Sequence, residues 1–152
     1  MAQLKFEITT PEKTVYKADI DQVTVPTPQG EITILPHHVP LVSQLVPGEL
    51  SVKQGNEVTH MAVSGGFIEV RPGSEVVVLA DTAERAEDID VKRAEEARAR
   101  AKALMESERK DETKFVDAVT SLEKHLARLR VAERAHHRPK RGFVTTEEGE
   151  DM

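Results

Sequence analysis

The sequence predicts an α+β protein: an N-terminal antiparallel β-sandwich, then a C-terminal antiparallel two-helix hairpin and a short disordered tail. Seven of the eight prolines and six of the eight glycines fall in residues 1–80, whereas residues 81–138 contain neither. The apolar spacing also changes at Asp81, from alternation in short runs to steps of three and four residues. We therefore expect a sandwich domain at 1–84, a hairpin at 85–138 and a flexible tail at 139–152.

The first 80 residues consist of short apolar runs separated by turn signals such as TPEK, PTPQG, KQGN and RPGS. Runs this short, with turns about every 8–12 residues, are typical of a small sandwich or barrel. Gly65-Gly66 separates two of the runs. The expected strands lie at 4–8, 23–25, 32–34, 50–52, 58–64, 66–70 and 75–80.

The second part shows helical spacing on both sides of the segment SERKDE, which predicts the turn of the hairpin. Small residues on the first helix would allow the apolar seam of the second to pack closely. The first helix presents Ala94, Ala97, Ala101 and Leu104, and the expected seam of the second is Phe115, Val119, Leu122, Leu126 and Leu129.

Composition excludes several classes of function. The chain has no cysteine and a net charge of −6, and only 3% of its residues are aromatic, which argues against thiolate chemistry and nucleic-acid binding. Neither a signal peptide nor a membrane-spanning run is expected. No catalytic motif is present, and the adjacent His37 and His38 diverge too much to share a metal, so we expect no enzyme activity and no metal site. His60 alternates within a strand and is expected to face solvent.

The segment EDIDVKRAEEA at residues 87–97 has two interpretations. Asp88 or Asp90 is an acceptable N-cap for a helix, and an i,i+3 pair of Asp90 with Arg93 would add only about 0.2–0.5 kcal/mol. Alternatively, the same two side chains form part of a binding site.

Two further segments also have two interpretations. The Pro-bounded loop in residues 28–41 is either a conformational staple or a rigid docking loop. Residues 118–141 hold seven Lys or Arg against two acids, so the second helix has either a solvated basic face or a docking surface for an acidic partner.

Three long stretches, GEITILPHHVPLVSQLVPGEL, VSGGFIEVRPGSEVVVLADTAERAEDID and RAEEA, closely resemble the epsilon-subunit family of bacterial F-type ATP synthases. The resemblance covers about residues 3–134. It implies a non-catalytic rotor subunit that contacts the gamma subunit and the polar loops of the c-ring. Its hairpin would regulate ATP hydrolysis by contacting the catalytic alpha and beta subunits. The implied location is the cytoplasmic face of the bacterial inner membrane, peripheral and through the complex alone.

The resemblance also assigns residues to partner contacts. Glu31, Pro36 and His38 match the family's c-ring loop, whereas Thr33 and His37 replace family glycines. We expect Glu31, Pro36, His37 and His38 on the c-ring side. On the basic helix face, the expected contacts are Arg130, Arg134 and Arg138.

Some family members bind ATP as a regulatory ligand through an I-D-x-x-R-A motif, and no other cofactor is implied. This chain matches that motif at Ile89, Asp90, Arg93 and Ala94. Lys124 and Arg128 would join Arg93 on the phosphates, Asp90 would accept from the adenine amino group, and Glu84 occupies the family's other polar position. The alternative to the rotor subunit is an unrelated β-sandwich protein-binding module with a helical docking arm.

Overall fold

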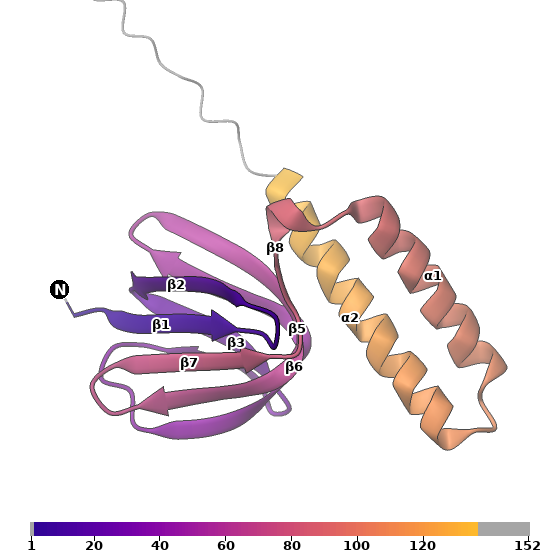
Figure 1. Cartoon of the computed structure of the whole chain (residues 1–152), viewed down its shortest axis with the longest axis horizontal. Coiled ribbons are helices and arrows are strands. Elements are labelled where there is room, and N and C mark those ends of the chain that lie inside the picture. The colour runs from indigo at the N-terminus through magenta and orange to yellow at the C-terminus, as the bar shows by residue number, and fades with distance from the viewer. Residues whose placement is uncertain (1, 137–152) are drawn as a thin grey trace, which may run out of the picture.

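The computed structural model describes residues 2–136, and Figure 1 shows a β-sandwich beside a helical hairpin. The predicted tail at 139–152 lies outside the described residues. The strands are β1 (Leu4–Thr9), β2 (Thr14–Ile20), β3 (Gln22–Thr27), β4 (Gly30–Ile34), β5 (Leu41–Gln54), β6 (Glu57–Arg71), β7 (Glu75–Ala80) and β8 (Ala83–Arg85). A single 3-10 turn, η1 (Ala86–Asp88), leads into the helices α1 (Val91–Ser107) and α2 (Glu112–His136).

One continuous sheet folds over to make both layers of the sandwich. Its strand order is β2-β1-β7-β6-β5-β3-β4, and β8 is added to β6. Every pairing is antiparallel except that of β1 with β7, which is parallel. The predicted sandwich is confirmed, with this one parallel pair as an exception.

The long strands β5 and β6 carry the chain from one layer to the other. On β6 the core side chains are Met61 and Val63 before the bend, and Ile68 and Val70 after it. Because strand side chains alternate, this change from odd to even positions requires a break in the pleat between them. The break falls at Gly65-Gly66, where both residues have φ near +118°.

Gly66 also allows the neighbouring backbone to approach closely. A Cβ at this position would lie 1.9 Å from the carbonyl oxygen of Leu79. Gly65-Gly66 was expected to separate two strands, but β6 continues through it as one bent strand of 15 residues. The prediction failed because it took paired glycines for a chain break, whereas glycine equally allows a bend within a strand.

Strand β2 and the three-residue β8 were missed, and β5 was predicted only at residues 50–52. β2 is an edge strand in which only Ile20 is buried, so its apolar alternation is weak. β5 runs for 14 residues and contains Pro47 and Gly48. These residue types usually mark a turn, but here the strand continues through them. Pro47 lies where β5 bends between the layers, a position at which a strand tolerates proline.

The hairpin packs through small residues, and α2 lies between the sandwich and α1 (Figure 1). Ala94 and Ala101 of α1 and Ala118 of α2 are buried, as expected for close helix packing. The predicted seam on α2 is only partly right. None of its five residues is buried and Leu126 is 38% exposed, whereas the buried positions are Ala118, Ala127, Val131 and Ala132. Because α2 packs on two surfaces at once, its apolar face is split between them.

Candidate functional site

The outer face of the sandwich under α2 carries two carboxylates in one row. Glu49 of β5 lies opposite Ala62 of β6, and Ala62 lies opposite Glu84 of β8. Directly paired residues project from the same face of a sheet, so Glu49 and Glu84 flank Ala62 on the side that α2 covers. We call these three residues the docking row.

Arg128 of α2 binds one end of the docking row. It donates from Nε to Oε2 of Glu84 at 2.6 Å and from Nη2 to Oε1 at 3.1 Å. The side chains are 15% and 33% exposed, so the pair is shielded from most of the solvent. Fork-shaped bidentate pairs of this kind are among the stronger ionic contacts in proteins.

Arg134 binds the other end. Its Nε lies 3.3 Å from Oε1 of Glu49, and the same carboxylate oxygen lies 2.6 Å from Nδ1 of His60. His60 therefore does not face open solvent as predicted. Its outward position is covered because α2 lies over this part of β6.

Between these two polar contacts lies a small apolar cluster. Ile89 and Ala94 of the predicted ATP motif belong to it, together with Ala62, Ala86, Val131 and Ala132. Most of these side chains are small, so α2 is held by a narrow apolar contact between two ionic ones. Ile89 and Ala94 thus have a structural role regardless of any ligand.

Asp90 and Arg93, the polar residues of the same motif, are both exposed. Oδ1 of Asp90 accepts a hydrogen bond of 3.1 Å from the backbone N–H of Arg93, so Asp90 is the N-cap of α1. The cap interpretation is therefore confirmed. The structure brings Glu84 and Arg128 together but places no contact between either of them and Asp90.

A basic cluster surrounds His125 next to the docking row. Burial lowers the pKa of His125, as do the positive charges of Arg128, Lys124 and Arg100, while Glu84 acts in the opposite direction. Nδ1 of His125 lies 3.1 Å from Nη1 of Arg128. Two of these residues, Arg100 and His125, were not among the predicted site residues. The sequence held only a weak signal for them. Arg100 lies two helical turns beyond Arg93 on α1, and His125 lies close to Arg128 in the sequence.

The root of the hairpin is held to the sandwich by Arg85 of β8. Its guanidinium lies 5.2 Å from the ring centre of Tyr16, and Nη2 donates to the carbonyl oxygen of Val15 at 3.2 Å. Both partners belong to β2. A shallow depression of about 740 Å³ lies beside this contact, and its lining includes Glu84, Glu87 and Asp88. Lys13 and Arg85 also line it, so acids outnumber bases three to two and the depression is poorly suited to phosphate.

The predicted c-ring residues lie at opposite ends of β4. Glu31 is exposed near its start, and Pro36, His37 and His38 follow its end. The backbone of His37 has φ of +68°, and its N–H donates to Oγ of Ser74 at 2.9 Å. Histidine thus occupies a left-handed conformation that glycine adopts more easily.

An apolar patch lies on the outer face of the other sandwich layer. Phe67 of β6 and Leu79 of β7 are paired across the strands and are 54% and 56% exposed. Val42 of β5, 69% exposed, lies diagonally beside Phe67 on the same face. Three large exposed apolar side chains side by side are typical of a protein contact.

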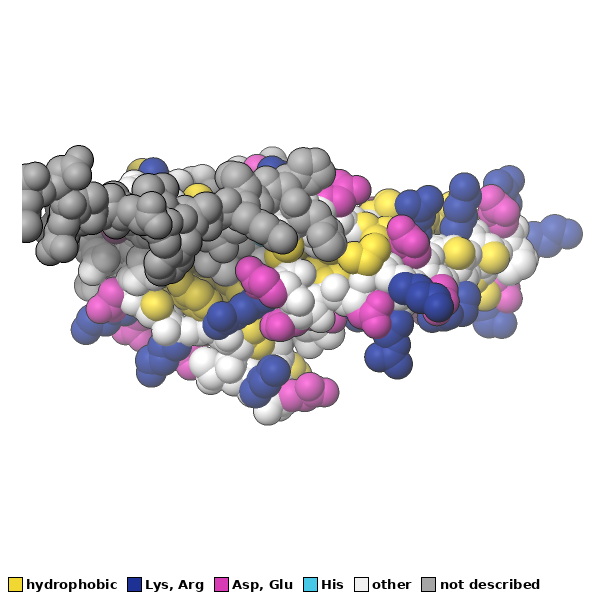
Figure 2. Space-filling view, turned by 90° about the horizontal axis from the view of Figure 1, so that it is seen from above, with side chains coloured by type: hydrophobic (Ala, Val, Ile, Leu, Met, Phe, Trp, Pro, Cys, Tyr) yellow, Lys and Arg dark blue, Asp and Glu magenta, His cyan; other side chains and the backbone are white. Residues whose placement is uncertain are grey.

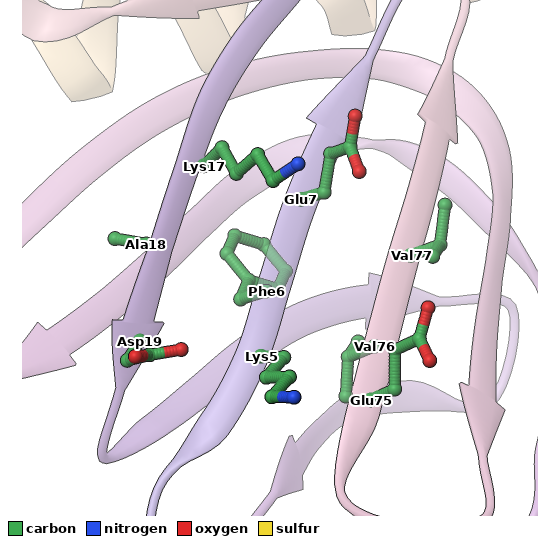
Figure 3. Close-up of a pocket in the computed structure, with 9 residues that line it drawn as sticks. All are labelled: Lys5, Phe6, Glu7, Lys17, Ala18, Asp19, Glu75, Val76 and Val77. Carbon is green, nitrogen blue, oxygen red and sulfur yellow. The ribbon is translucent and has the colours of Figure 1, made fainter.

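The same layer differs toward β1 and β2. A depression of about 490 Å³ lies there. Among the residues that line it, Figure 3 shows Lys17 and Glu7 pointing toward each other, with Lys5 and Glu75 nearby. Alternating charges of this kind are typical of a solvated face. On this layer the candidate contact surface is therefore centred on Val42, Phe67 and Leu79.

The predicted basic face of α2 is only partly free. Arg130 is exposed, whereas Arg134 contacts Glu49. Arg138 lies outside the described residues. Figure 2 shows Lys and Arg side chains distributed along the hairpin, interspersed with Asp and Glu and with apolar surface. Among residues 2–136, no helix is both long and apolar enough to cross a bilayer.

Fold and site together define a protein built for contacts with other proteins, with a β-sandwich and a separately docked helical arm. A model of the ATP synthase delta/epsilon chain β-sandwich domain matches residues 3–86, and one of the long α-helix domain of the same chain matches residues 87–133. The chain therefore belongs to the ATP synthase delta/epsilon chain family.

Relatives and solved structures agree with this assignment. The ATP synthase epsilon chain of Dehalococcoides mccartyi is 47% identical over 139 residues, which span 91% of this chain and 99% of the relative. That of Halalkalibacterium halodurans is 43% identical, over 88% of this chain and 100% of the relative. A chain in the cryo-EM structure of the Euglena gracilis mitochondrial ATP synthase, OSCP/F1/c-ring, superposes with a TM-score of 0.73 and 27% identity, covering 90% of this chain and 83% of that one.

A chain in the central stalk/c-ring structure from Tetrahymena thermophila shares the fold, with a TM-score of 0.52 and 15% identity over 88% of this chain and 96% of that one. The protein is an epsilon-type, non-catalytic subunit of the ATP synthase central stalk. The alternative of an unrelated sandwich module is excluded.

Proposed function

We propose that the hairpin of this subunit regulates ATP hydrolysis by leaving and rejoining the docking row. In the docked form hydrolysis proceeds. In the released form α2, about 37 Å long for 25 residues, extends along the gamma subunit and obstructs the catalytic alpha and beta subunits.

The observation that carries this proposal is the nature of the docked contact. Two ion pairs, Arg128–Glu84 and Arg134–Glu49, flank a cluster of mostly small apolar residues. Such a contact loses little apolar burial on release and re-forms readily in water. Leu104 and Leu126 are 48% and 38% exposed even in the docked form, so they offer apolar surface for a released helix to bury on a partner.

The test is ATP hydrolysis by the assembled complex with and without the hairpin. A chain that ends after Glu87 keeps all eight strands and should still assemble. Its complex should hydrolyse ATP faster than the complex with the full chain. Equal rates would rule out inhibition by the hairpin in this protein.

The partner surfaces follow from the exposed faces. The apolar patch of Val42, Phe67 and Leu79 is proposed to pack on gamma.

Leu35 and Val39, 53% and 71% exposed, border the loop of Pro36, His37 and His38 that is proposed to meet the c-ring. Glu31 is proposed for the same partner from the other end of β4. The basic face, with Arg130, Arg134 and Arg138, is proposed to meet the catalytic subunits once α2 is released. Through these partners the subunit would lie at the cytoplasmic face of the bacterial inner membrane.

A second function is supported by the basic cluster. Arg100, Lys124 and Arg128 all act on His125, so three cations from two helices converge beside the docking row. We propose that this cluster binds the phosphates of ATP when the hairpin is docked. In this proposal Arg93 joins the cluster, and Asp90 accepts a hydrogen bond from the adenine amino group. Glu84 positions Arg128, and Ile89 and Ala94 form the apolar wall of the site. ATP would then stabilise the docked form, because it binds residues that only that form brings together.

Calorimetry tests this second function on the full chain. Millimolar ATP should give heat with the wild type and markedly weaker binding with Arg93→Ala. Asp90→Ser, which keeps the cap, should weaken binding as much as Asp90→Ala if the carboxylate contacts adenine. Absence of heat with the wild type would exclude ATP as a ligand and leave the hairpin proposal intact.

A further inference from the structure

The imidazole of His125 lies against one nitrogen of the Arg128 guanidinium. Its Nδ1 lies 3.1 Å from Nη1 of Arg128. An arginine side chain has donors and no acceptor, so Nδ1 must be the acceptor in this contact. The imidazole is therefore neutral in the free protein and carries its proton on Nε2.

The charged groups around His125 favour this neutral form. Arg128 and Lys124 face it from α2, Arg100 from α1 and Glu84 from β8. Burial and the three cations disfavour the imidazolium, and the negatively charged Glu84 is already paired with Arg128. An added negative charge in this cluster would instead favour the protonated imidazolium.

Three of the five N–H donors of Arg128 have partners among the neighbouring side chains. Nε and Nη2 are held by the carboxylate of Glu84, and Nη1 is held by His125. Displacing Glu84 would break one of the two ion pairs that dock α2. Displacing His125 would leave that pair intact. Because Glu84 holds the Nε and Nη2 side of the guanidinium, an anion that leaves this ion pair intact approaches Arg128 from the Nη1 end, where His125 lies.

We propose that His125 is a proton-linked positioning residue of the phosphate site: a phosphate group takes its place on Nη1 of Arg128, and the displaced imidazole takes up one proton from solvent and stays beside the phosphate as a cation. This inference rests on the ATP binding proposed above and assigns its pH dependence. Because binding favours the protonated imidazole, ATP binds more tightly as the pH falls, by at most about tenfold per pH unit from this group.

The experiment compares the wild type with His125→Asn by calorimetry with ATP at about pH 6 and pH 8. Each titration is repeated in two buffers of different ionisation enthalpy to count the protons taken up. Asparagine retains an oxygen that can accept from Arg128 but cannot be protonated. The titration of ATP itself is common to both proteins, so the difference between them reports His125. The wild type should take up a larger fraction of a proton, and its ratio of affinities at the two pH values should exceed that of the variant by roughly three- to tenfold.

Three results decide the outcome. Equal proton uptake and equal pH dependence in the two proteins would overturn the role of His125 while leaving ATP binding standing. Absence of heat with the wild type would overturn both. Should His125→Asn fail to fold, the His125 resonances of the wild type decide instead. Their pKa should rise on saturation with ATP, and also with inorganic triphosphate, and an unchanged pKa would overturn the proposal.

Discussion

Glu49 and Glu84 stand on either side of Ala62 in one cross-strand row, and each binds a different arginine of α2. Arg128 and Arg134 are six residues apart, so the two contacts hold α2 at two points along its axis. This arrangement defines one position for the hairpin although the apolar contact between the two points is small. Docking is thus confined to one position and modest in strength, as the proposed regulatory role requires.

The first prediction concerns the stronger of the two contacts. Arg128→Ala should loosen the docked hairpin by about 1–3 kcal/mol, because it removes a bidentate pair and leaves Glu84 partly shielded without its partner. Hydrogen exchange of the α2 amides in the isolated chain should accelerate, while exchange in the sandwich stays unchanged. Arg130→Ala is the matched control, since Arg130 is exposed on the same helix. Equal protection of α2 in all three proteins would show that the pair does not hold the hairpin.

A second prediction separates the two roles assigned to Asp90. Its side chain caps α1, so Asp90→Ala should cost about 1 kcal/mol of helix stability and Asp90→Ser much less. Urea denaturation of the full chain checks this order. A serine variant as unstable as the alanine variant would mean that the negative charge matters more than the capping bond.

The third prediction uses the backbone of His37. Because its φ of +68° is costly for residues other than glycine, His37→Gly should leave the chain as stable or slightly more so. His37→Val should destabilise it by about 1–2 kcal/mol, since β-branched residues fit the left-handed region poorly. Thermal unfolding of the two variants provides the comparison. A stable valine variant would indicate that the loop takes another path.

Whether a strand could be predicted from the sequence depended on how much of it is buried. Strong alternation, as at Leu4, Phe6 and Ile8, predicts a strand because one face of it is fully buried. Thr14–Ile20 was missed because an edge strand with one buried residue has almost no such pattern. This strand forms because it pairs with β1, and a pairing with another strand cannot be read from the residues of Thr14–Ile20 alone.

The site was predictable only where the family resemblance pointed to its residues. Glu84 and Arg128 were named from a family resemblance, and the structure pairs them. Arg100 and His125 were missed because their spacing from Arg93 and Arg128 is a weak signal that other polar residues of the two helices share. Only the packing of α1 against α2 shows that their charges act on each other.

The fourth prediction tests the apolar patch as the gamma-binding surface. Phe67→Ser and Leu79→Ser should weaken co-purification with gamma strongly, because both side chains are more than half exposed and become buried only in a complex. Their effect on the stability of the isolated chain should stay within about 0.5 kcal/mol. Val58→Ser, at a position 41% exposed elsewhere on β6, should bind gamma normally. Normal binding by the Phe67 and Leu79 variants would place gamma on another face.

The fifth prediction is a pH dependence of hairpin docking in the absence of ligand. Burial and the neighbouring cations lower the pKa of His125 in the docked form. The released form, in which His125 is solvated, therefore binds more protons than the docked one. Docking is fully stable above the ordinary histidine pKa of about 6.5 and loses stability as the pH falls below it toward the lowered value.

The measurement is the distance between fluorescent probes on α2 and on the sandwich, followed from about pH 8 to pH 5 in the wild type and in His125→Asn. Every other titratable group is common to the two proteins, so the difference between the two curves isolates His125. The wild type should release its hairpin at a higher pH than the variant does. Superimposable curves would contradict this, because they would mean that the neutral imidazole is not needed beside Arg128. Acidification and ATP should then act in opposite directions on the same residue: protons alone weaken docking, whereas protons together with a bound phosphate strengthen it.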